Sequence, residues 1–242
     1  MEVALLTVGD ELLAGDTENT NASWLGRQLT AAGATVTRVL TVPDDRSVIA
    51  DAVARYHDSF DAVIVTGGIG GTPDDVTKAG VAQAFDLALV VPDDVRARLE
   101  AKAEQFAANN PEMVSRYDMD IDLDAWASVP EGAAPLLTDE SFAAGCVLDD
   151  VYVLPGIPDE LKTMFHTIAD EFDGTRTTET IHTPAPEGAL VAAVTTAGDR
   201  FDVAVGSYPR KDNQPGRVKV TGDDPVAVAD ATAWLRERIE TR

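Results

Sequence analysis

The chain has 242 residues, of which 45% are hydrophobic, so it is long enough to form one large domain or two smaller ones around a buried core. Its 42 acidic and 19 basic residues give a net charge of −23, which disfavours non-specific binding to nucleic acid or to an anionic membrane over most of the surface. The single cysteine, Cys146, excludes an internal disulfide and a multi-cysteine metal site, and we expect it to be a buried packing residue.

The acidic excess is spread along the chain rather than gathered in one segment. It comes from 28 aspartates and 14 glutamates, with only 5 lysines beside 14 arginines. This pattern favours a halophilic protein, because a Debye length of about 3 Å in 1 M salt screens the repulsion between the carboxylates. The alternative is an ordinary acidic protein.

Targeting signals are not evident. No basic segment precedes the first apolar run, and no apolar run approaches the length of about 18 residues that a membrane-spanning helix needs. We therefore expect neither a signal peptide nor a transmembrane helix, and a cytoplasmic location.

The N-terminal part of the chain alternates between short apolar runs and amphipathic segments. Strands are predicted over 3–8, 36–42 and 62–66. Helices are predicted over 21–32, which Gly33 ends, and over 45–56, where Val48, Ile49 and Val53 face the core; a third helix begins near Asp74 or Asp75. Alternation of this kind predicts an α/β domain with a parallel sheet covered on both faces.

The middle of the chain contains one long predicted helix, from Pro92 to about Asn109. The polar segment 110–125 has aspartates at every second position: Asp118, Asp120, Asp122 and Asp124. A calcium loop is one interpretation, but the glycine and glutamate of such a loop are missing, so we favour a solvated acidic loop. A hairpin is predicted over 147–154, followed by a helix that Asp159 caps and that runs to about Phe172.

Beyond Gly174 the composition becomes rich in threonine. Strands are predicted over 178–183, 200–206 and 217–221, and helices over 190–196 and 225–239. These elements indicate a small α+β subdomain with antiparallel or mixed strands. We predict a first domain over 1–174 and this subdomain over 175–242.

A glycine-rich loop follows the strand 62–66 and reads Thr66-Gly67-Gly68-Ile69-Gly70-Gly71-Thr72-Pro73-Asp74-Asp75. Glycine permits positive φ and close approach of backbone N–H groups, so a strand-to-helix turn of this composition is a candidate anion site. The loop lacks the lysine of a Walker motif and the spacing of a dinucleotide-binding motif. The alternative is a tight connection capped by Asp74 or Asp75.

A second polar loop, Gly9-Asp10-Glu11 with Asn19 and Asn21, follows the strand 3–8. Because parallel strands end at one edge of a sheet, this loop should share a crevice with the glycine-rich loop and with Asp44 and Asp45. Carboxylates beside a phosphate site require a cation, which indicates Mg²⁺ or a similar divalent metal. Helix capping is the alternative role for each aspartate.

These residues resemble a known family. The segments Gly9 to Leu13, Asn19-Thr20-Asn21, Val42 to Asp45, Thr66 to Thr77 and Leu154 to Glu160 together resemble the molybdopterin-binding domain of the MoaB/Mog type, in the version of the CinA (competence/damage-inducible protein A) family. The match covers about residues 1–170, and Gly206-Ser207-Tyr208-Pro209 resembles the tail of the short archaeal-like members.

The resemblance implies a three-layer α/β/α domain with a mostly parallel sheet that binds a phosphorylated pterin or nucleotide. It implies one of two activities: Mg²⁺-dependent adenylylation of molybdopterin with ATP, or metal-dependent hydrolysis of ADP-ribose by a pyrophosphatase. We expect no nicotinamide-nucleotide deamidase domain. Asp44 and Asp75 match the catalytic and metal-binding carboxylates. The implied ligand-binding residues are Gly9, Asp10, Glu11, Asn19, Asn21, Thr66, Gly67, Gly68, Gly70, Gly71, Thr72, Asp74, Pro155 and Gly156.

Two departures from the family pattern concern the ligand. Gly71 stands where the family usually has proline, and Leu137 to Gly145 replaces a segment that normally holds an asparagine and an Ala-Pro-Gly-like turn. We expect His57, His166 and His182 to form no metal site, and Trp24, Trp126 and Trp234 to be packing residues.

The main hypothesis is therefore an enzyme of phosphoanhydride chemistry. The alternative is a non-catalytic protein that binds molybdopterin or a nucleotide. The expected partner is a small phosphorylated ligand, not nucleic acid or a membrane, and related domains imply a homodimer or homotrimer.

Overall fold

A computed structural model of the chain describes residues 1–117, 122–210 and 215–241. Two compact units are distinguished by their internal contacts. The larger comprises Glu2–Arg27 and Val36–Glu171, and the smaller comprises Met1, Gln28–Thr35 and Phe172–Arg242.

A six-stranded sheet forms the centre of the larger unit, with strand order β2-β1-β3-β8-β7-β6. Its strands are β1 (Glu2–Val8), β2 (Thr35–Val42), β3 (Ala62–Thr66), β6 (Ala134–Leu136), β7 (Gly145–Leu148) and β8 (Val151–Leu154). β3 pairs in parallel with both β1 and β8, whereas β7 is antiparallel to β8 and to β6. The predicted strands and the hairpin are thus confirmed. A separate pair, β4 (Leu89–Val90) and β5 (Val129–Pro130), is antiparallel.

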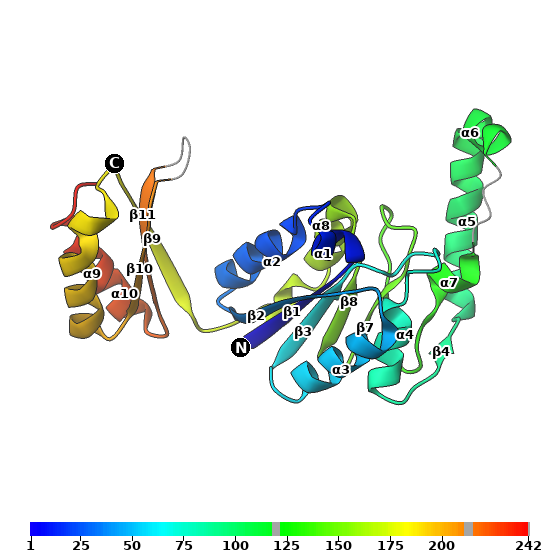
Figure 1. The fold of residues 1–242 in the computed structure, drawn as a ribbon, viewed down its shortest axis with the longest axis horizontal. Helices are drawn as coiled ribbons and strands as arrows, with labels where there is room; N and C mark the ends of the chain where they lie inside the picture. The colour runs from blue at the N-terminus through cyan, green and yellow to red at the C-terminus, as the bar shows by residue number, and fades with distance from the viewer. Residues whose placement is uncertain (118–121, 211–214, 242) are drawn as a thin grey trace. The chain divides into compact units, whose positions relative to one another are not determined.

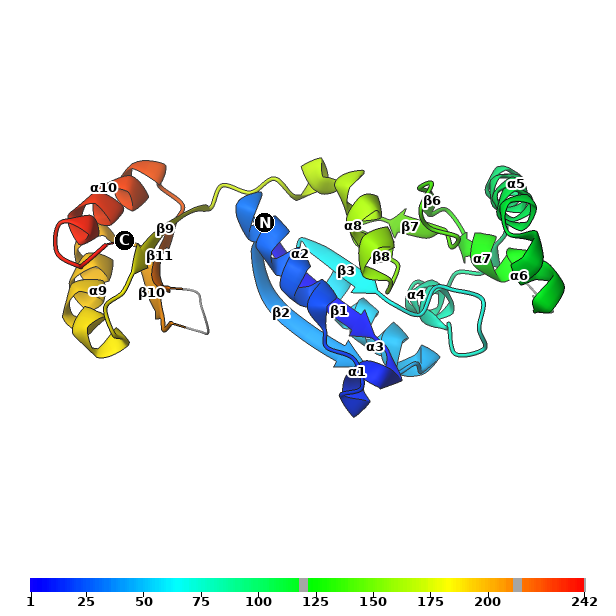
Figure 2. The same ribbon diagram turned by 90° about the horizontal axis from the view of Figure 1, so that it is seen from above.

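Helices cover both faces of this sheet, with α2 and α8 on one side and α3 and α4 on the other (Figures 1 and 2). The helices are α1 (Asp10–Ala14), α2 (Thr20–Ala31), α3 (Arg46–His57), α4 (Thr77–Ala84), α5 (Asp93–Asn109), α6 (Pro111–Arg116), α7 (Leu123–Ala127), α8 (Pro158–His166) and the 3₁₀ helix η1 (Ala169–Phe172). Burial on both faces explains why β1, β3 and β8 are almost continuous apolar runs. The predicted three-layer α/β/α architecture with a mostly parallel sheet is correct.

Some predicted helix details are wrong. Val48 does not face the core: it is 40% exposed, because it lies about 100° around α3 from the fully buried Ile49. α4 begins at Thr77, so neither Asp74 nor Asp75 is its N-cap residue, which is Val76. Asp159 lies in the first turn of α8 rather than at its cap, and α8 ends at His166 before the 3₁₀ helix.

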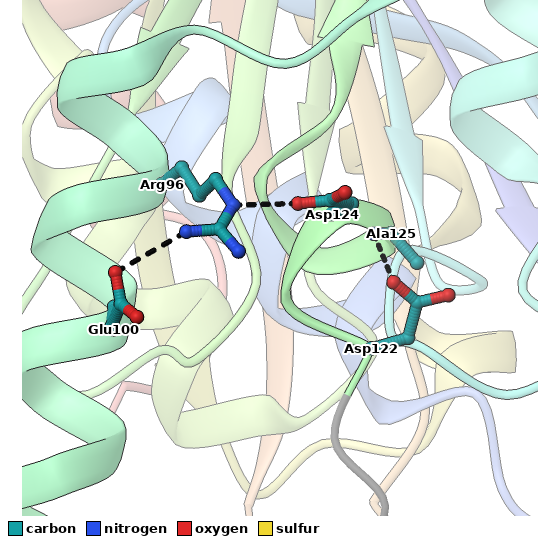
Figure 3. A network of polar contacts seen from close by, with 5 residues as sticks. All are labelled: Arg96, Glu100, Asp122, Asp124 and Ala125. Carbon is teal, nitrogen blue, oxygen red and sulfur yellow. Dashed lines mark hydrogen bonds and ion pairs between the residues drawn. The ribbon is translucent and has the colours of Figure 1, made fainter.

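The acidic segment 110–125 is not one irregular loop, because α6 and α7 form within it. Asp122 accepts a hydrogen bond from the amide of Ala125 (2.9 Å) and caps α7, and Asp124 accepts one from Nε of Arg96 (2.7 Å; Figure 3). Both carboxylates therefore have structural roles. Asp118 and Asp120 lie outside the described residues.

The smaller unit contains an antiparallel sheet with strand order β10-β11-β9. Its elements are β9 (Thr177–Thr183), α9 (Glu187–Phe201), β10 (Ala204–Tyr208), β11 (Gly216–Gly222) and α10 (Pro225–Arg236). Ile181, Val218, Val220 and Leu235 belong to its core. The strand predicted over 200–206 is displaced, because α9 continues to Phe201 and the left-handed residue Asp202 (φ 53°) ends it.

Cys146 lies in β7 with no exposed surface, and burial raises the pKa of its thiol to about 12. The prediction of a buried packing cysteine is confirmed. No helix in the described part of the chain has both the length and the apolar character needed to cross a bilayer.

Candidate functional site

A cavity of about 250 Å³, called here the first cavity, lies where β1, β2, β3 and β8 end at one edge of the sheet. The glycine-rich loop, the loop after β1 and Asp44, which lies two residues beyond β2, all reach it. Predicted site residues that line it are Gly9, Glu11, Asn19, Asn21, Asp44, Thr66, Gly67, Gly68, Asp74, Asp75 and Gly156. Asp10 does not line it.

Two consecutive left-handed glycines turn the chain out of β3. Gly67 has φ +100° and Gly68 has φ +62°, which only glycine adopts without strain. Gly67 packs against the carbonyl of Val8, and its amide donates a hydrogen bond to the carbonyl of Leu154 (3.2 Å). The amide of Gly67 therefore completes the sheet edge rather than facing a ligand.

The next four amides of the loop, unlike that of Gly67, have no hydrogen-bond acceptor in the described chain. Within the described chain, the N–H groups of Gly68, Ile69, Gly70 and Gly71 donate no hydrogen bond to any protein acceptor. These residues are half-buried or buried, and such backbone donors are normally satisfied by some partner. Successive donors on a glycine-rich turn form an anion-binding concavity.

Asp44 lies beside this loop at the end of β2. Its Oδ2 accepts a hydrogen bond from the amide of Asp10 (2.9 Å), and its Oδ1 lies 3.3 Å from the position that a Cβ on Gly68 would occupy. Burial raises the pKa of Asp44, and the negative charges of Asp10, Glu11 and Asp74 raise it further. Its neighbour Asp45 instead caps α3 by accepting hydrogen bonds from two amides in the first turn.

Asp75 organises the loop itself. Its Oδ2 accepts hydrogen bonds from the amide (2.8 Å) and hydroxyl (2.5 Å) of Thr72. Nearby, the hydroxyl of Thr77 is fully buried, has no hydrogen-bond partner among the described residues and lies 2.5 Å from the position of a Gly68 Cβ. The space beside Gly68 is thus bounded by the Asp44 carboxylate and an unsatisfied hydroxyl.

Asn19 and Asn21, predicted with the second polar loop, form hydrogen bonds that connect β1, α2 and the turn after β8. Asn19 donates a hydrogen bond to the hydroxyl of Thr7 (2.9 Å) and accepts one from the amide of Ala22 (3.0 Å) at the start of α2. Asn21 donates to the carbonyl of Gly156 (2.6 Å), which links α2 to the turn after β8. These bonds position the walls of the first cavity.

A second cavity of about 370 Å³ adjoins the first and shares Gly68, Asp75 and Gly156 with it. The predicted site residues Gly70, Gly71, Thr72 and Pro155 line it, and so do Trp126, Phe142, Ile157 and Glu160. Trp126 and Phe142 are in contact, with ring centroids 5.4 Å apart. Gly68 therefore lines both a strongly acidic cavity and a mainly apolar one, whereas Ile69, Gly70 and Gly71 line only the second.

Comparison with known proteins identifies the family of the domain that carries these two cavities. Residues 4–173 match the family model described as a probable molybdopterin binding domain. The chain belongs to this molybdopterin-binding family. It is 34% identical to a protein of Archaeoglobus fulgidus over the full length of both chains.

Other relatives of this family carry the CinA name. The chain is 39% identical to a CinA-like protein of Frankia casuarinae over 68% of this chain, but it spans only 38% of that protein. The crystal structure of CinA from Thermoplasma acidophilum matches with a TM-score of 0.61 and 29% identity, covering 71% of this chain and 97% of that one. Residues 176–242 match the family model described as FAD synthase, middle domain.

Both departures from the molybdopterin-binding family pattern fall at the second cavity. A side chain at position 71 would collide with the indole nitrogen of Trp126, so Trp126 explains the glycine there. Within the segment 137–145, Phe142 and Ala143 line the cavity, and Ser141 Oγ donates a hydrogen bond to the carbonyl of Ala143 (2.9 Å). Both positions therefore belong to the apolar cavity, and none of these residues lines the acidic one.

The residues of the first cavity fit a hard divalent cation. Its lining includes the carboxylates of Glu11, Glu18, Asp44, Asp74 and Asp75, and no basic side chain of the described residues lines it. No cluster of three or more His, Cys, Asp or Glu side chains in the described chain could hold a metal alone. Mg²⁺ is commonly held by one or two carboxylates together with substrate phosphates, so the Asp44 carboxylate suits it.

Sequence reasoning missed several residues of these cavities. Trp126 was expected to be a packing residue, yet it also lines the second cavity, together with Phe142 and Glu160. Thr77, which adjoins Gly68 but lines neither cavity, was not singled out either. The spacing of Thr77 after the glycines was a usable signal, but nothing in the sequence brings Trp126 or Phe142 to the loop, because that contact depends on the packing of α7. Trp24 packs against Phe165, and Trp234 against Phe201, as predicted.

Proposed function

We propose that the chain binds a phosphorylated pterin or nucleotide and performs Mg²⁺-dependent phosphoanhydride chemistry on it. The observation that carries this proposal is the run of four amides, Gly68 to Gly71, that donate to no acceptor within the described chain. Phosphate oxygens are strong acceptors and suit such a turn. The two reactions that fit are a CinA-type nucleotide pyrophosphatase and a molybdopterin adenylyltransferase-like reaction.

Asp44 and Asp75 are the proposed metal-binding and catalytic carboxylates. Bound Mg²⁺ would neutralise charge on the phosphate oxygens and on the surrounding carboxylates. The chain itself supplies the positioning. The loop amides orient the phosphates, and the hydrogen bond from the Asp10 amide holds one oxygen of Asp44 so that the other faces Gly68.

A non-catalytic binding protein is the second candidate, and the state of Asp75 favours it. One oxygen of this carboxylate already accepts two hydrogen bonds from Thr72, which suits a residue that shapes the loop better than one that removes a proton. The two candidates share the same ligand site and differ only in turnover.

Family membership supports a role in molybdenum cofactor biosynthesis, which we propose for this chain. The proposed partner is a small phosphorylated molecule. We also propose a homodimer or homotrimer and a cytoplasmic location.

The test is a direct assay of the purified protein at about 2 M KCl, where its charge is well screened. One reaction contains ADP-ribose, and the other contains ATP and molybdopterin. Each is run in the presence and in the absence of Mg²⁺, and the nucleotide products are separated by chromatography. The enzyme proposal expects metal-dependent product in one of the two reactions. If calorimetry shows ligand binding but neither reaction gives product, the result would support the non-catalytic protein instead.

A matched pair of variants separates site residues from helix caps. Asp44→Asn keeps a hydrogen-bond acceptor but removes the charge, and we expect Mg²⁺-dependent nucleotide binding to weaken by about tenfold or more. Asp45→Asn makes the same change one residue away, where asparagine is still a good N-cap, and should leave binding within about twofold. Equal effects of the two variants on binding would contradict the assignment of Asp44.

A further inference from the structure

The antiparallel sheet of the smaller unit has one face that no described helix of this unit covers. Both α9 and α10 lie on the opposite face (Figures 1 and 2). Burial alternates along β11, so Val218 and Val220 point toward the helices and the residues between them point away. Directly opposite residues of an antiparallel pair share a face. The uncovered face, called here the open face, therefore consists of Ala204, Gly206 and Tyr208 on β10, Arg217, Lys219 and Thr221 on β11, and Thr178, Thr180 and His182 on β9.

The open face lacks the negative charge that dominates the rest of the chain. None of its residues is an aspartate or a glutamate, although the chain has 42 acidic and 19 basic residues. Neither Arg217 nor Lys219 forms an ion pair with a described residue. Nε of Arg217 is buried and has no hydrogen-bond partner in the described chain. Side chains two residues apart on a strand stand about 7 Å apart, so both cations can reach one anionic group.

Tyr208 adds an aromatic surface beside these two cations. The guanidinium of Arg217 lies 5.2 Å from the centroid of its ring, and the ammonium of Lys219 lies 5.9 Å from it. The ring lies against Gly206, because a Cβ at that position would stand only 3.2 Å from Cε2 of Tyr208. Gly206 thus lets the ring lie down along the sheet, and Tyr208 remains 44% exposed. Ser207, between them, points to the helix side and donates a hydrogen bond to Glu187 (3.2 Å).

We propose that the open face binds one nucleotide, with its base stacked on Tyr208 and its phosphate held by Arg217 and Lys219. Phosphate oxygens match a pair of cations that the fold leaves without acidic partners, and an exposed aromatic ring stacks on any base. Tyr208 is the one large aromatic side chain of the open face, so the face accommodates a single base. The net charge of −23 disfavours a polynucleotide, which needs many phosphate contacts.

This site is additional to the phosphate loop. None of its residues lines either of the two cavities described above, all of whose lining residues precede position 161. The inference therefore does not depend on the proposed function, and a test without Mg²⁺ separates it from binding at the loop.

The test follows the four tyrosines of the full-length protein by NMR after selective isotope labelling of their rings. Tyr208→Leu removes one signal and thereby assigns it, and Tyr117→Leu assigns a control. AMP is titrated in the presence of EDTA, which withholds the metal proposed for the phosphate loop. The Tyr208 signal should shift and saturate. The Tyr117 signal should not move, although this tyrosine is also exposed and lies beside an arginine, Arg116.

The phosphate contacts are tested by substitution. Arg217→Gln and Lys219→Gln should each weaken AMP binding by about fivefold or more, because each removes a charge-assisted contact. Arg236→Gln is the matched control on the helix side of the smaller unit, where the residue is exposed, and should leave the affinity within about twofold. Adenosine, which lacks the phosphate, should bind more weakly than AMP by at least about fivefold. Thermal unfolding shows whether each variant is folded, and the comparison of adenosine with AMP needs no variant.

Three results would overturn this inference. The first is a Tyr208 signal that AMP does not shift, and the second is an AMP affinity that equals that of adenosine or survives both Arg217→Gln and Lys219→Gln. The third is a single strand of about ten adenylates that binds about a hundredfold more tightly than AMP, which would assign the open face to a polynucleotide instead. None of these results bears on the phosphate loop, which the Mg²⁺-dependent assay tests separately.

Discussion

Gly68 matters both for the backbone conformation of the loop and for the side chains that lie next to it. Its left-handed φ lets the chain turn out of β3, and the absence of a side chain allows the Thr77 hydroxyl and the Asp44 carboxylate to approach it closely. Its carbonyl also accepts a hydrogen bond from the amide of Thr77 (2.9 Å), which fixes the loop to the start of α4. A glycine is therefore required here for two independent reasons.

Replacing Gly68 with alanine tests this dual requirement. We expect Gly68→Ala to lower the free energy of unfolding by about 1–3 kcal/mol, from the left-handed conformation and the close approach to Thr77, and to abolish nucleotide binding. Gly132→Ala is the control, because Gly132 has a similar φ of +85° but nothing within 4 Å of the new methyl group. Urea unfolding and calorimetry measure the two effects; Gly68→Ala binding nucleotide as the wild type does would contradict the assignment of the loop.

At the scale of elements, α4 and α7 are joined by the buried Lys78. Burial lowers the pKa of this lysine to about 8, because the charged form loses its hydration, while the negative charge of Asp75 acts in the opposite direction. The hydrogen bonds from Lys78 to α7 satisfy its ammonium group and place Trp126 against the glycine-rich loop.

The shifted pKa predicts a pH dependence of stability. Between pH 8 and 10.5 the unfolded chain keeps a proton on Lys78 that the folded chain releases, so the free energy of unfolding rises with pH in this window. Each unit of pKa shift contributes about 1.4 kcal/mol. Lys78→Met removes this contribution, so the stability of the wild type relative to this variant should increase from pH 8 to 10.

Urea unfolding at a series of pH values measures that difference. Lys162→Met is the control, since Lys162 is only partly buried and pairs with the exposed Asp159. Its difference from the wild type should be nearly independent of pH across the window. Parallel stability curves for the wild type and Lys78→Met would show that the folded-state pKa of Lys78 is not lowered.

At the scale of the whole molecule, the expected spread of the acidic excess along the whole chain is wrong, because most of the excess lies in residues 1–171. Residues 1–171 carry 31 acidic and 10 basic residues, whereas residues 172–242 carry 11 and 9. Self-repulsion therefore acts mainly within the segment that contains the ligand cavities. We propose that the protein is adapted to high salt, where this repulsion is screened.

Salt should accordingly stabilise the protein. Raising KCl from about 0.1 M to 1 M shortens the Debye length from about 10 Å to 3 Å, and we expect the midpoint of thermal unfolding to rise by roughly 5–10 °C. Differential scanning calorimetry measures the midpoint, and sucrose at matched osmolality controls for effects unrelated to charge. A midpoint that is independent of KCl would contradict the proposed halophilic character.

Much of the larger unit was predictable because its signals are local. The apolar runs of β1, β3 and β8 must be buried, and the glycines after β3 mark the turn that carries the loop amides. The segment 110–125 was harder to predict, since α6 and α7 are short and their stability depends on contacts such as that between Arg96 and Asp124. The start of β10 was misplaced because apolar residues near Phe201 suit a buried helix end as well as a strand.

The sequence by itself determined the parallel sheet, the edge at which its loops meet and the molybdopterin-binding resemblance, because strand periodicity and glycine-rich turns depend on neighbouring residues. Only the tertiary structure decided which of two adjacent aspartates faces the cavity, that Asp75 shapes the loop, and that Trp126, Phe142 and Glu160 form a second cavity beside it. Those arrangements depend on contacts between residues tens of positions apart, and no local pattern encodes the packing that brings such residues together.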